Sequence, residues 1–218
     1  MQHLTQKDRK VVVKAYRGAY GAALALAALA TGLALPALAD VKAGVDAWAA
    51  GDFSKAVAEW RGPADKGDPD AQFNLAQAYK LGRGVPRDLT RAETLYAAAA
   101  TKGHLQASDN YGLMLFQRGE RAKAMPYIRA AAERGDARAQ YIYGLAMFNG
   151  DGVPKDWQRA YAYVSMAQQA GLPQATGALA QMDANIPMAD RQKAVVLAGT
   201  LASEIESRRA RQVAAMDL

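Results

Sequence analysis

The sequence predicts an all-α fold, an α/α superhelical solenoid of stacked helical hairpins. The first observation behind this prediction is internal repetition with a period near 36 residues, which is typical of arrays built from one supersecondary unit. The second is composition: half of the residues are apolar and Ala is abundant, whereas Phe and Trp are few. Small apolar residues favour close helix–helix packing, so both observations indicate the same fold class.

The first 39 residues predict a removable export signal. Residues 1–17 are polar and basic, Gly18 to Leu35 carry no charge, and Ala37-Leu38-Ala39 provides a small-residue cleavage site. We therefore expect cleavage after Ala39, a periplasmic mature protein in a Gram-negative envelope, and only transient contact with the membrane. An uncleaved anchor is the alternative, because about 20 apolar residues span a bilayer.

Composition excludes several classes of function. The formal net charge is +6, but residues 1–39 contribute four of these charges, and the remaining chain carries 22 basic and 20 acidic residues. Nucleic acid is therefore not an expected partner, since it requires a concentrated basic face. The chain has no cysteine, which excludes disulfides, Cys-bound zinc and thiol nucleophiles.

The repeats divide the chain after the signal. Residues 67–102 and 135–170 are two copies of 36 residues, and the 32-residue copy between them, 103–134, has a shortened central loop, QRGER. The predicted organisation is a signal peptide at 1–39, a degenerate leading helical hairpin at 40–66, three repeats within 67–170, and C-terminal capping helices at 171–218.

Each repeat is predicted to contain two helices, A and B. In the third copy, helix A carries Ala139, Tyr143 and Met147 at a spacing of four residues, so these side chains share one face. Helix B carries Ala160, Val164 and Ala167 at similar spacing. The small residues Ala76, Gly112 and Gly144 are expected to let helix B approach helix A closely.

The loop G-x-G-V-P-x-D joins the two helices in the first and third copies. Gly82 and Gly84 can adopt positive φ, which ends helix A, and Asp88 is placed to cap helix B, as is Asp156 in the third copy. Gly103, Gly135 and Gly171 are expected to end each helix B in the same way. The middle copy lacks this loop, which predicts a tighter turn, and Pro126 predicts an irregularity in its helix B.

These residues closely resemble the Sel-1-like repeat, a relative of the tetratricopeptide repeat with a longer loop between its helices. The first copy matches that pattern at Ala71, Leu75, Ala76, Tyr79, Gly82, Gly84, Val85, Asp88, Ala92, Tyr96, Ala99 and Gly103. The resemblance implies an exported bacterial repeat protein that binds a protein or peptide partner.

No catalytic, cofactor or metal-binding motif is recognisable, so we expect a protein without enzymatic activity, cofactor or metal. There is no G-x-S-x-G, H-E-x-x-H or phosphate-binding loop. His104 is interpreted as a solvated loop residue, and Asp65, Asp68 and Asp70 as helix-start residues. Arg208, Arg209 and Arg211 are interpreted as part of a solvated face of mixed charge, with an acidic partner or a lipid surface as the alternative.

Helix A lines the concave face in tetratricopeptide repeats, and the resemblance transfers that role by position. The candidate partner-binding residues are Phe73, Gln77, Lys80, Asp109, Leu113, Phe116, Tyr141, Leu145 and Phe148. We hypothesise that Leu113, Phe116, Tyr141, Leu145 and Phe148 form a groove for an apolar peptide or a partner helix. The alternative is that several of them pack on the next hairpin.

Three functions remain open at this point. The leading expectation is an exported scaffold for a protein or peptide partner. A cell-wall accessory role through peptidoglycan is the first alternative. A β-lactam-type hydrolase is the second, and it is disfavoured because the sequence shows no pairing of a nucleophile with a base. The identity of the partner and the oligomeric state are not predicted, nor is whether residues 186–218 cap the solenoid or bind a partner.

Overall fold

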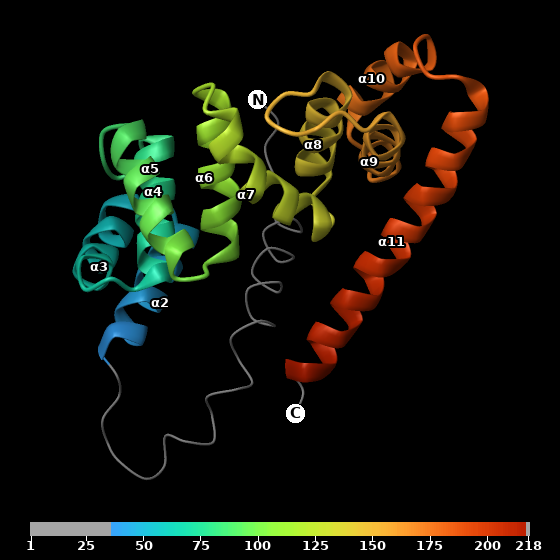
Figure 1. The fold of residues 1–218 in the computed structure, drawn as a ribbon. Helices are drawn as coiled ribbons and strands as arrows, with labels where there is room; N and C mark the ends of the chain where they lie inside the picture. The colour runs from blue at the N-terminus through green and yellow to red at the C-terminus, as the bar shows by residue number, and fades with distance from the viewer. Residues whose placement is uncertain (1–35, 217–218) are drawn as a thin grey trace.

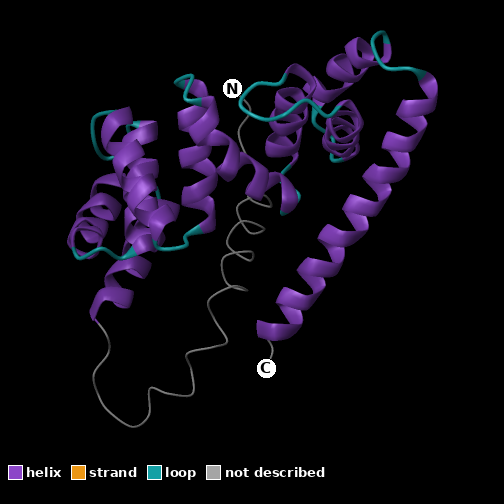
Figure 2. Ribbon diagram, in the orientation of Figure 1, coloured by secondary structure: helices purple, strands orange, loops and turns teal. Residues whose placement is uncertain are grey.

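The computed structural model describes residues 36–216, and within that range every regular element is an α-helix (Figure 2). The described helices are α2 (Pro36–Ala49), α3 (Phe53–Asp65), α4 (Pro69–Leu81), α5 (Leu89–Thr101), α6 (Leu105–Gln117), α7 (Arg121–Glu133), α8 (Ala137–Asn149), α9 (Trp157–Gln169), α10 (Pro173–Asp183) and α11 (Met188–Met216). They follow one another as hairpins and end in the long α11 (Figure 1).

The predicted solenoid is confirmed. Helices pack within the hairpins α2–α3, α4–α5, α6–α7 and α8–α9, and the second helix of each hairpin also packs on the first helix of the next. Residues 67–102, 103–134 and 135–170 each contain one hairpin, and α2–α3 occupies the predicted leading segment. Residues 1–35 of the predicted signal lie outside the described residues, and its predicted cleavage site at Ala39 falls within α2.

The long loops have the predicted geometry. Gly82 and Gly150 end α4 and α8 with φ of 67° and 83°, in the left-handed region that glycine occupies without strain. The Asp88 and Asp156 carboxylates each accept a hydrogen bond of 2.9 Å from a backbone N–H of the following turn. These two N-caps confirm the prediction from the G-x-G-V-P-x-D motif.

The middle hairpin differs from its neighbours as predicted. Three residues, 118–120, connect α6 to α7, whereas seven residues, 82–88, connect α4 to α5. Pro126 lies inside α7, which nevertheless runs without a break from Arg121 to Glu133. One backbone donor is lost at Pro126, and the surrounding turns keep the helix continuous.

The hairpins are joined in two different ways. Gln72 and Gln140, at the start of α4 and α8, donate side-chain hydrogen bonds of 3.2 and 3.3 Å to the carbonyls of Ala64 and Ala132 in the preceding hairpin. Ser108 stands at the matching place in α6 and bonds within its own helix. The long loops add a second contact at the same two joints, because Gly84 lies against Phe53 of α3 and Gly152 against the start of α7.

The joint between α5 and α6 has neither the glutamine hydrogen bond nor the contact with a long loop. Three polar contacts cross it instead: Lys80 Nζ donates to Asn110 Oδ1 at 2.7 Å, His104 Nε2 lies 3.3 Å from Asp70 Oδ1, and Arg118 pairs with Glu93 at 3.0 Å. The hydrophobic core also divides near this joint. One cluster extends from Val41 to Ala107 and the other begins at Leu115, and Tyr111 packs against both.

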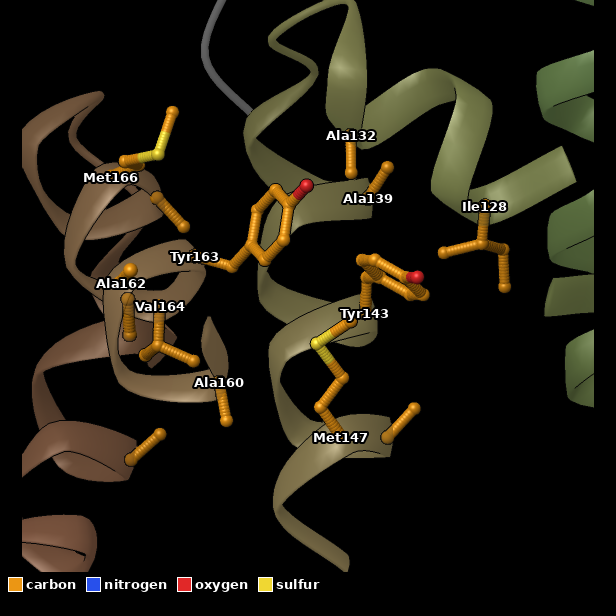
Figure 3. Packing of buried hydrophobic residues seen from close by; sticks show 14 of the residues in the cluster. Ile128, Ala132, Ala139, Tyr143, Met147, Ala160, Ala162, Tyr163, Val164 and Met166 are labelled. Carbon is orange, nitrogen blue, oxygen red and sulfur yellow. The ribbon is translucent and has the colours of Figure 1, made fainter. Parts of the chain in front are cut away.

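The second core cluster illustrates how a hairpin closes (Figure 3). Tyr143 and Tyr163 pack edge to face with ring centroids 5.2 Å apart, and Val164 lies across from Gly144. Ile128 of α7 closes the cluster from the preceding hairpin. Aromatic pairs in this geometry add stability beyond the area that they bury.

The long helix α11 packs along α9 and reaches the C-terminal end of α7. Arg208 and Arg209 donate hydrogen bonds of 2.9 and 2.8 Å to the carbonyls of Glu133 and Arg134, which lie at the end of α7. Both residues are exposed, as expected for a solvated face, and they also hold α11 to the end of α7. They satisfy carbonyls that the end of a helix leaves without intrahelical partners.

Candidate functional site

The candidate site is the face formed by the first helix of each hairpin, which we call the A-helix face. Shifting the chain by 68 residues places Gly51 on Gly119 and Gly67 on Gly135, so α2–α5 and α6–α9 are two copies of a two-hairpin block. With this shift Val45 and Trp48 match Leu113 and Phe116, and Gln77 matches Leu145. The same A-helix positions are therefore presented twice.

Five of the predicted residues form an apolar, half-buried strip on α6 and α8. They are Leu113, Phe116, Tyr141, Leu145 and Phe148. All except Leu113 pack against the second core cluster while keeping part of their surface exposed. Arg121 lies over the Phe116 ring at 5.3 Å, and Phe148 faces Trp157 at 6.5 Å. The strip combines packing with accessible apolar surface.

Two other predicted residues are engaged inside the protein. Phe73 is only 8% exposed and packs between the rings of Tyr96 and His104, so it offers little surface to a partner. Asp109 pairs with Arg134, the residue that follows α7. Burial raises the pKa of Asp109, and the hydrogen bond from Arg134 opposes that shift.

The remaining two are on α4, where Gln77 lines a pocket between α2 and α4 and Lys80 contacts α6. This pocket has a volume of about 150 Å³, opens to solvent, and is lined by Val45, Trp48, Trp60, Asn74, Gln77 and Leu81. Trp60 is fixed by a hydrogen bond of 3.2 Å from its Nε1 to the Val41 carbonyl, and Trp48 packs on it at 5.5 Å. The pocket therefore has a preformed aromatic wall with two amide side chains on α4.

The α2 side of this pocket was not predicted from the sequence. The leading hairpin lacks the long loop and diverges from the repeat pattern, so Val45 and Trp48 received no role. Aligning the leading hairpin with the middle hairpin, which also lacks the loop, matches Val45 and Trp48 with residues of the apolar strip. The glycines that the alignment superposes, Gly51 and Gly119, have φ of 87° and 86°. The signal was present at a period of 68 residues and not at 36.

Lys80 follows the pocket residue Gln77 on α4 and extends toward α6. Its Nζ donates to Asn110, and it lies over the ring of Tyr96 at 5.8 Å. Burial lowers the pKa of Lys80, and the positive charge of Arg138 on α8 lowers it further. A cation is thus held partly out of water, where an anionic group would stabilise its charge.

His104 is not the solvated residue that we expected. Its side chain is 10% exposed, its ring stacks on Phe73 at 4.5 Å, and its Nδ1 accepts a hydrogen bond of 3.1 Å from Ala107 N–H. It caps α6, as Asp68 and Asp136 cap α4 and α8. Histidine is an uncommon N-cap, so sequence alone did not suggest this role.

Two features are absent from the part of the chain that the structure describes. Across residues 36–216, no group of three or more His, Cys, Asp or Glu side chains is placed to hold a metal ion. In the same range, no helix is both long and apolar enough to cross a membrane.

The sequence profile of the Sel1 repeat matches residues 69–104 and 137–172, the two copies with the long loop. Among curated proteins, the chain is 26% identical over 155 residues to an exopolysaccharide production negative regulator of Rhizobium meliloti, covering 62% of this chain and 58% of that protein. It is 28% identical over 131 residues to the alginate biosynthesis protein AlgK of Azotobacter vinelandii, covering 57% of this chain and 28% of that protein. The chain thus spans only part of the length of these relatives.

Solved structures agree with the fold. A Sel1 repeat protein from Oxalobacter formigenes is 29% identical, with a TM-score of 0.59 over 78% of this chain and 73% of that one. The protective antigen c5321 of uropathogenic Escherichia coli, which displays an SLR fold, is 22% identical, with a TM-score of 0.55 over 80% of this chain and 48% of that one. Repeats of this type typically form scaffolds for protein interaction. Helical hairpins, loop glycines and the two matched segments together show that the chain carries two Sel1 repeats within a solenoid of the Sel1-repeat fold.

Proposed function

We propose that this protein is an exported, non-enzymatic scaffold that binds a segment of a protein or peptide partner on its A-helix face in the periplasm. The observation that carries the proposal is the repetition of accessible apolar side chains at matching positions of both blocks, namely Val45 and Trp48 in one and Leu113 and Phe116 in the other. Helical solenoids characteristically use such an extended face for partners. The basic, apolar and small-residue order of residues 1–39 supports export.

The names of two relatives favour a partner in the cell envelope. One relative is a regulator of exopolysaccharide production and the other an alginate biosynthesis protein. Both names concern the production of polysaccharides, and an exopolysaccharide is one that leaves the cell, so we propose an envelope protein as the partner.

Leu113→Glu tests the use of the face. Leu113 is half-buried and belongs to neither core cluster, so a charge there should leave the fold intact and abolish partner binding. Val196→Ser is the matched control, because Val196 is 72% exposed on α11, away from the A-helix face. Circular dichroism of each purified variant checks that folding is unchanged.

The measurement is crosslinking in intact cells with a C-terminal tag, followed by mass spectrometry of the partners and of the N-terminus of the protein. We expect an N-terminus at Asp40 and a reproducible envelope partner that is captured by the wild type and by Val196→Ser but not by Leu113→Glu. Equal capture by the folded Leu113→Glu variant would show that the partner binds elsewhere. A retained N-terminus would show that residues 18–35 act as an anchor.

A further inference from the structure

We propose that the A-helix face recognises an acidic peptide segment, with an apolar side chain in the α2–α4 pocket and a nearby carboxylate at Lys80, Asn110 and Arg138. This inference rests on the proposed function and adds the chemistry of the partner. It depends on the charges of the A-helix face, on the unused donors around the pocket, and on the distance between pocket and cation.

The acidic side chains on this face have partners within the protein, whereas two of the basic side chains do not form ion pairs within the described chain. Asp70 faces His104, Asp109 pairs with Arg134, and Lys42 pairs with Asp46. Lys80 and Arg138 have no carboxylate within 4.0 Å among residues 36–216. The acidic groups of the face are therefore engaged, and the two cations on α4 and α8 are left to an external anion.

The polar groups near Lys80 suit a carboxylate. An ammonium group has three donors, and within the described chain Lys80 gives one of them to Asn110 Oδ1. Asn74 and Gln77, on the pocket side of the same helix, form no hydrogen bond with another described residue. Within the described chain, Lys80 beside α6 and the two amides at the pocket therefore keep unused donors.

The charges also act on one another. Burial lowers the pKa of Lys80, and the positive charge of Arg138 on α8 lowers it further. An anion bound beside Lys80 would oppose both effects, because an opposite charge stabilises the charged ammonium group. Hydrogen bonds between charged groups are also stronger than those between neutral groups.

The spacing of pocket and cation sets the expected motif. The Cβ atoms of Gln77, which lines the pocket, and Lys80 are roughly 5–6 Å apart, as for any two residues one helical turn apart, and the Lys80 side chain extends from there toward Asn110 of α6. An extended peptide advances about 3.3 Å per residue. The Asp or Glu should therefore follow or precede the apolar anchor by about one to four residues.

The test is selection of peptides on the purified full chain from a phage-displayed library of random 12-residue sequences. Two enriched peptides are then synthesised with fluorescent labels, each also with its Asp and Glu replaced by Asn and Gln. Fluorescence anisotropy measures their binding to the wild type, to Lys80→Gln and Arg138→Gln, and to Arg211→Gln, which removes a charge from the exposed part of α11.

We expect the enriched peptides to combine Trp, Phe or Leu with a nearby acidic residue. Each of Lys80→Gln and Arg138→Gln should weaken binding by about tenfold, as loss of a charged hydrogen bond does, and Arg211→Gln should leave it unchanged. The affinity of the neutral peptides for the wild type should be about as low as the affinity of the acidic peptides for Lys80→Gln. The neutral peptides should bind Lys80→Gln and the wild type equally well.

The other outcomes separate the two proposals. Peptides that lack acidic residues, bind Lys80→Gln as well as the wild type and fail on Leu113→Glu would overturn the anion site and leave the scaffold function standing. Absence of any enriched peptide would count against both. A wild type that dimerises in sedimentation and becomes monomeric as Lys80→Gln would assign the face to a second copy and also overturn the acidic-peptide proposal.

Discussion

At the scale of single residues, small side chains set how closely the two helices of a hairpin approach. Gly112 faces Tyr127, and Gly144 faces Ala160 and Val164. A Cβ placed on Gly144 would lie 2.7 Å from Val164 Cγ2 and 2.8 Å from the Ala160 carbonyl. The carbonyl belongs to the backbone and cannot turn aside, so the contact requires glycine at this position.

Gly144→Ala should therefore destabilise the protein. We expect a loss of about 1–3 kcal/mol in the free energy of unfolding, the usual cost of forcing an extra methyl group into a packed interior. Gly199→Ala is the matched control, because Gly199 is exposed within α11 and a Cβ added there would have no neighbour within 4 Å. The control should be neutral or more stable by up to about 1 kcal/mol. Urea denaturation of both variants measures the difference, and equal stabilities would contradict the close-approach argument.

Tyr96 makes a second prediction at this scale. Its hydroxyl is buried without a hydrogen-bond partner among the described residues, so Tyr96→Phe should raise stability at neutral pH by about 1 kcal/mol. Burial also raises the pKa of Tyr96 above its ordinary value of 10.0. The folded state therefore favours the neutral phenol. The resulting contribution to the free energy of unfolding is complete below pH 10.0 and is lost as the pH rises above that value.

The measurement is thermal unfolding of the wild type and Tyr96→Phe from pH 7 to about 11. The wild type should lose stability more steeply than the variant above about pH 10. A variant that is less stable at neutral pH, with an unchanged alkaline slope, would show that the hydroxyl has a partner after all.

At the scale of elements, the caps and loops define where each helix begins and ends. Asp156 accepts a hydrogen bond from Arg159 N–H at the start of α9, and Asp190 offers a control, since it lies in the first turn of α11 and pairs only with Lys193. Asp156→Ala should cost about 1 kcal/mol and Asp190→Ala less than about 0.5 kcal/mol. Chemical denaturation would refute the capping role if both substitutions had the same effect.

These elements were also the part of the structure that sequence predicted best. Gly82, Asp88 and their counterparts act through the backbone of their own turn, so their local pattern is sufficient to predict the loop. Arg208 and Arg209 act on a distant segment, which their residue type does not reveal. His104 caps its own helix and also contacts Asp70 of α4, and histidine is an uncommon N-cap. The pocket between α2 and α4 was missed because the leading hairpin diverges from the 36-residue pattern and because Trp60 enters the pocket through packing across the hairpin.

At the scale of the whole molecule, the two core clusters meet at α6, and the joint there is held mainly by polar contacts. Stability in a solenoid is approximately a sum of terms within and between neighbouring units. A defect in one block should therefore be felt mostly within that block.

Val57→Ala tests this division. Val57 is 2% exposed in the first cluster, so its truncation should cost about 1–3 kcal/mol. Amide hydrogen exchange followed by mass spectrometry should then show faster exchange in α2–α5 and unchanged exchange in α8–α11. Uniform acceleration across all helices would show that the two clusters unfold as one cooperative unit.

The two kinds of joint have a consequence for how this chain can grow. Glutamine and the long loop link hairpins within a block, whereas the contact between blocks uses different residues. Duplication of a single 36-residue hairpin would bring together two hairpins whose contacting residues belong to different kinds of joint. Duplication of 68 residues preserves every kind of neighbour, so the heritable module of this array is the pair of hairpins.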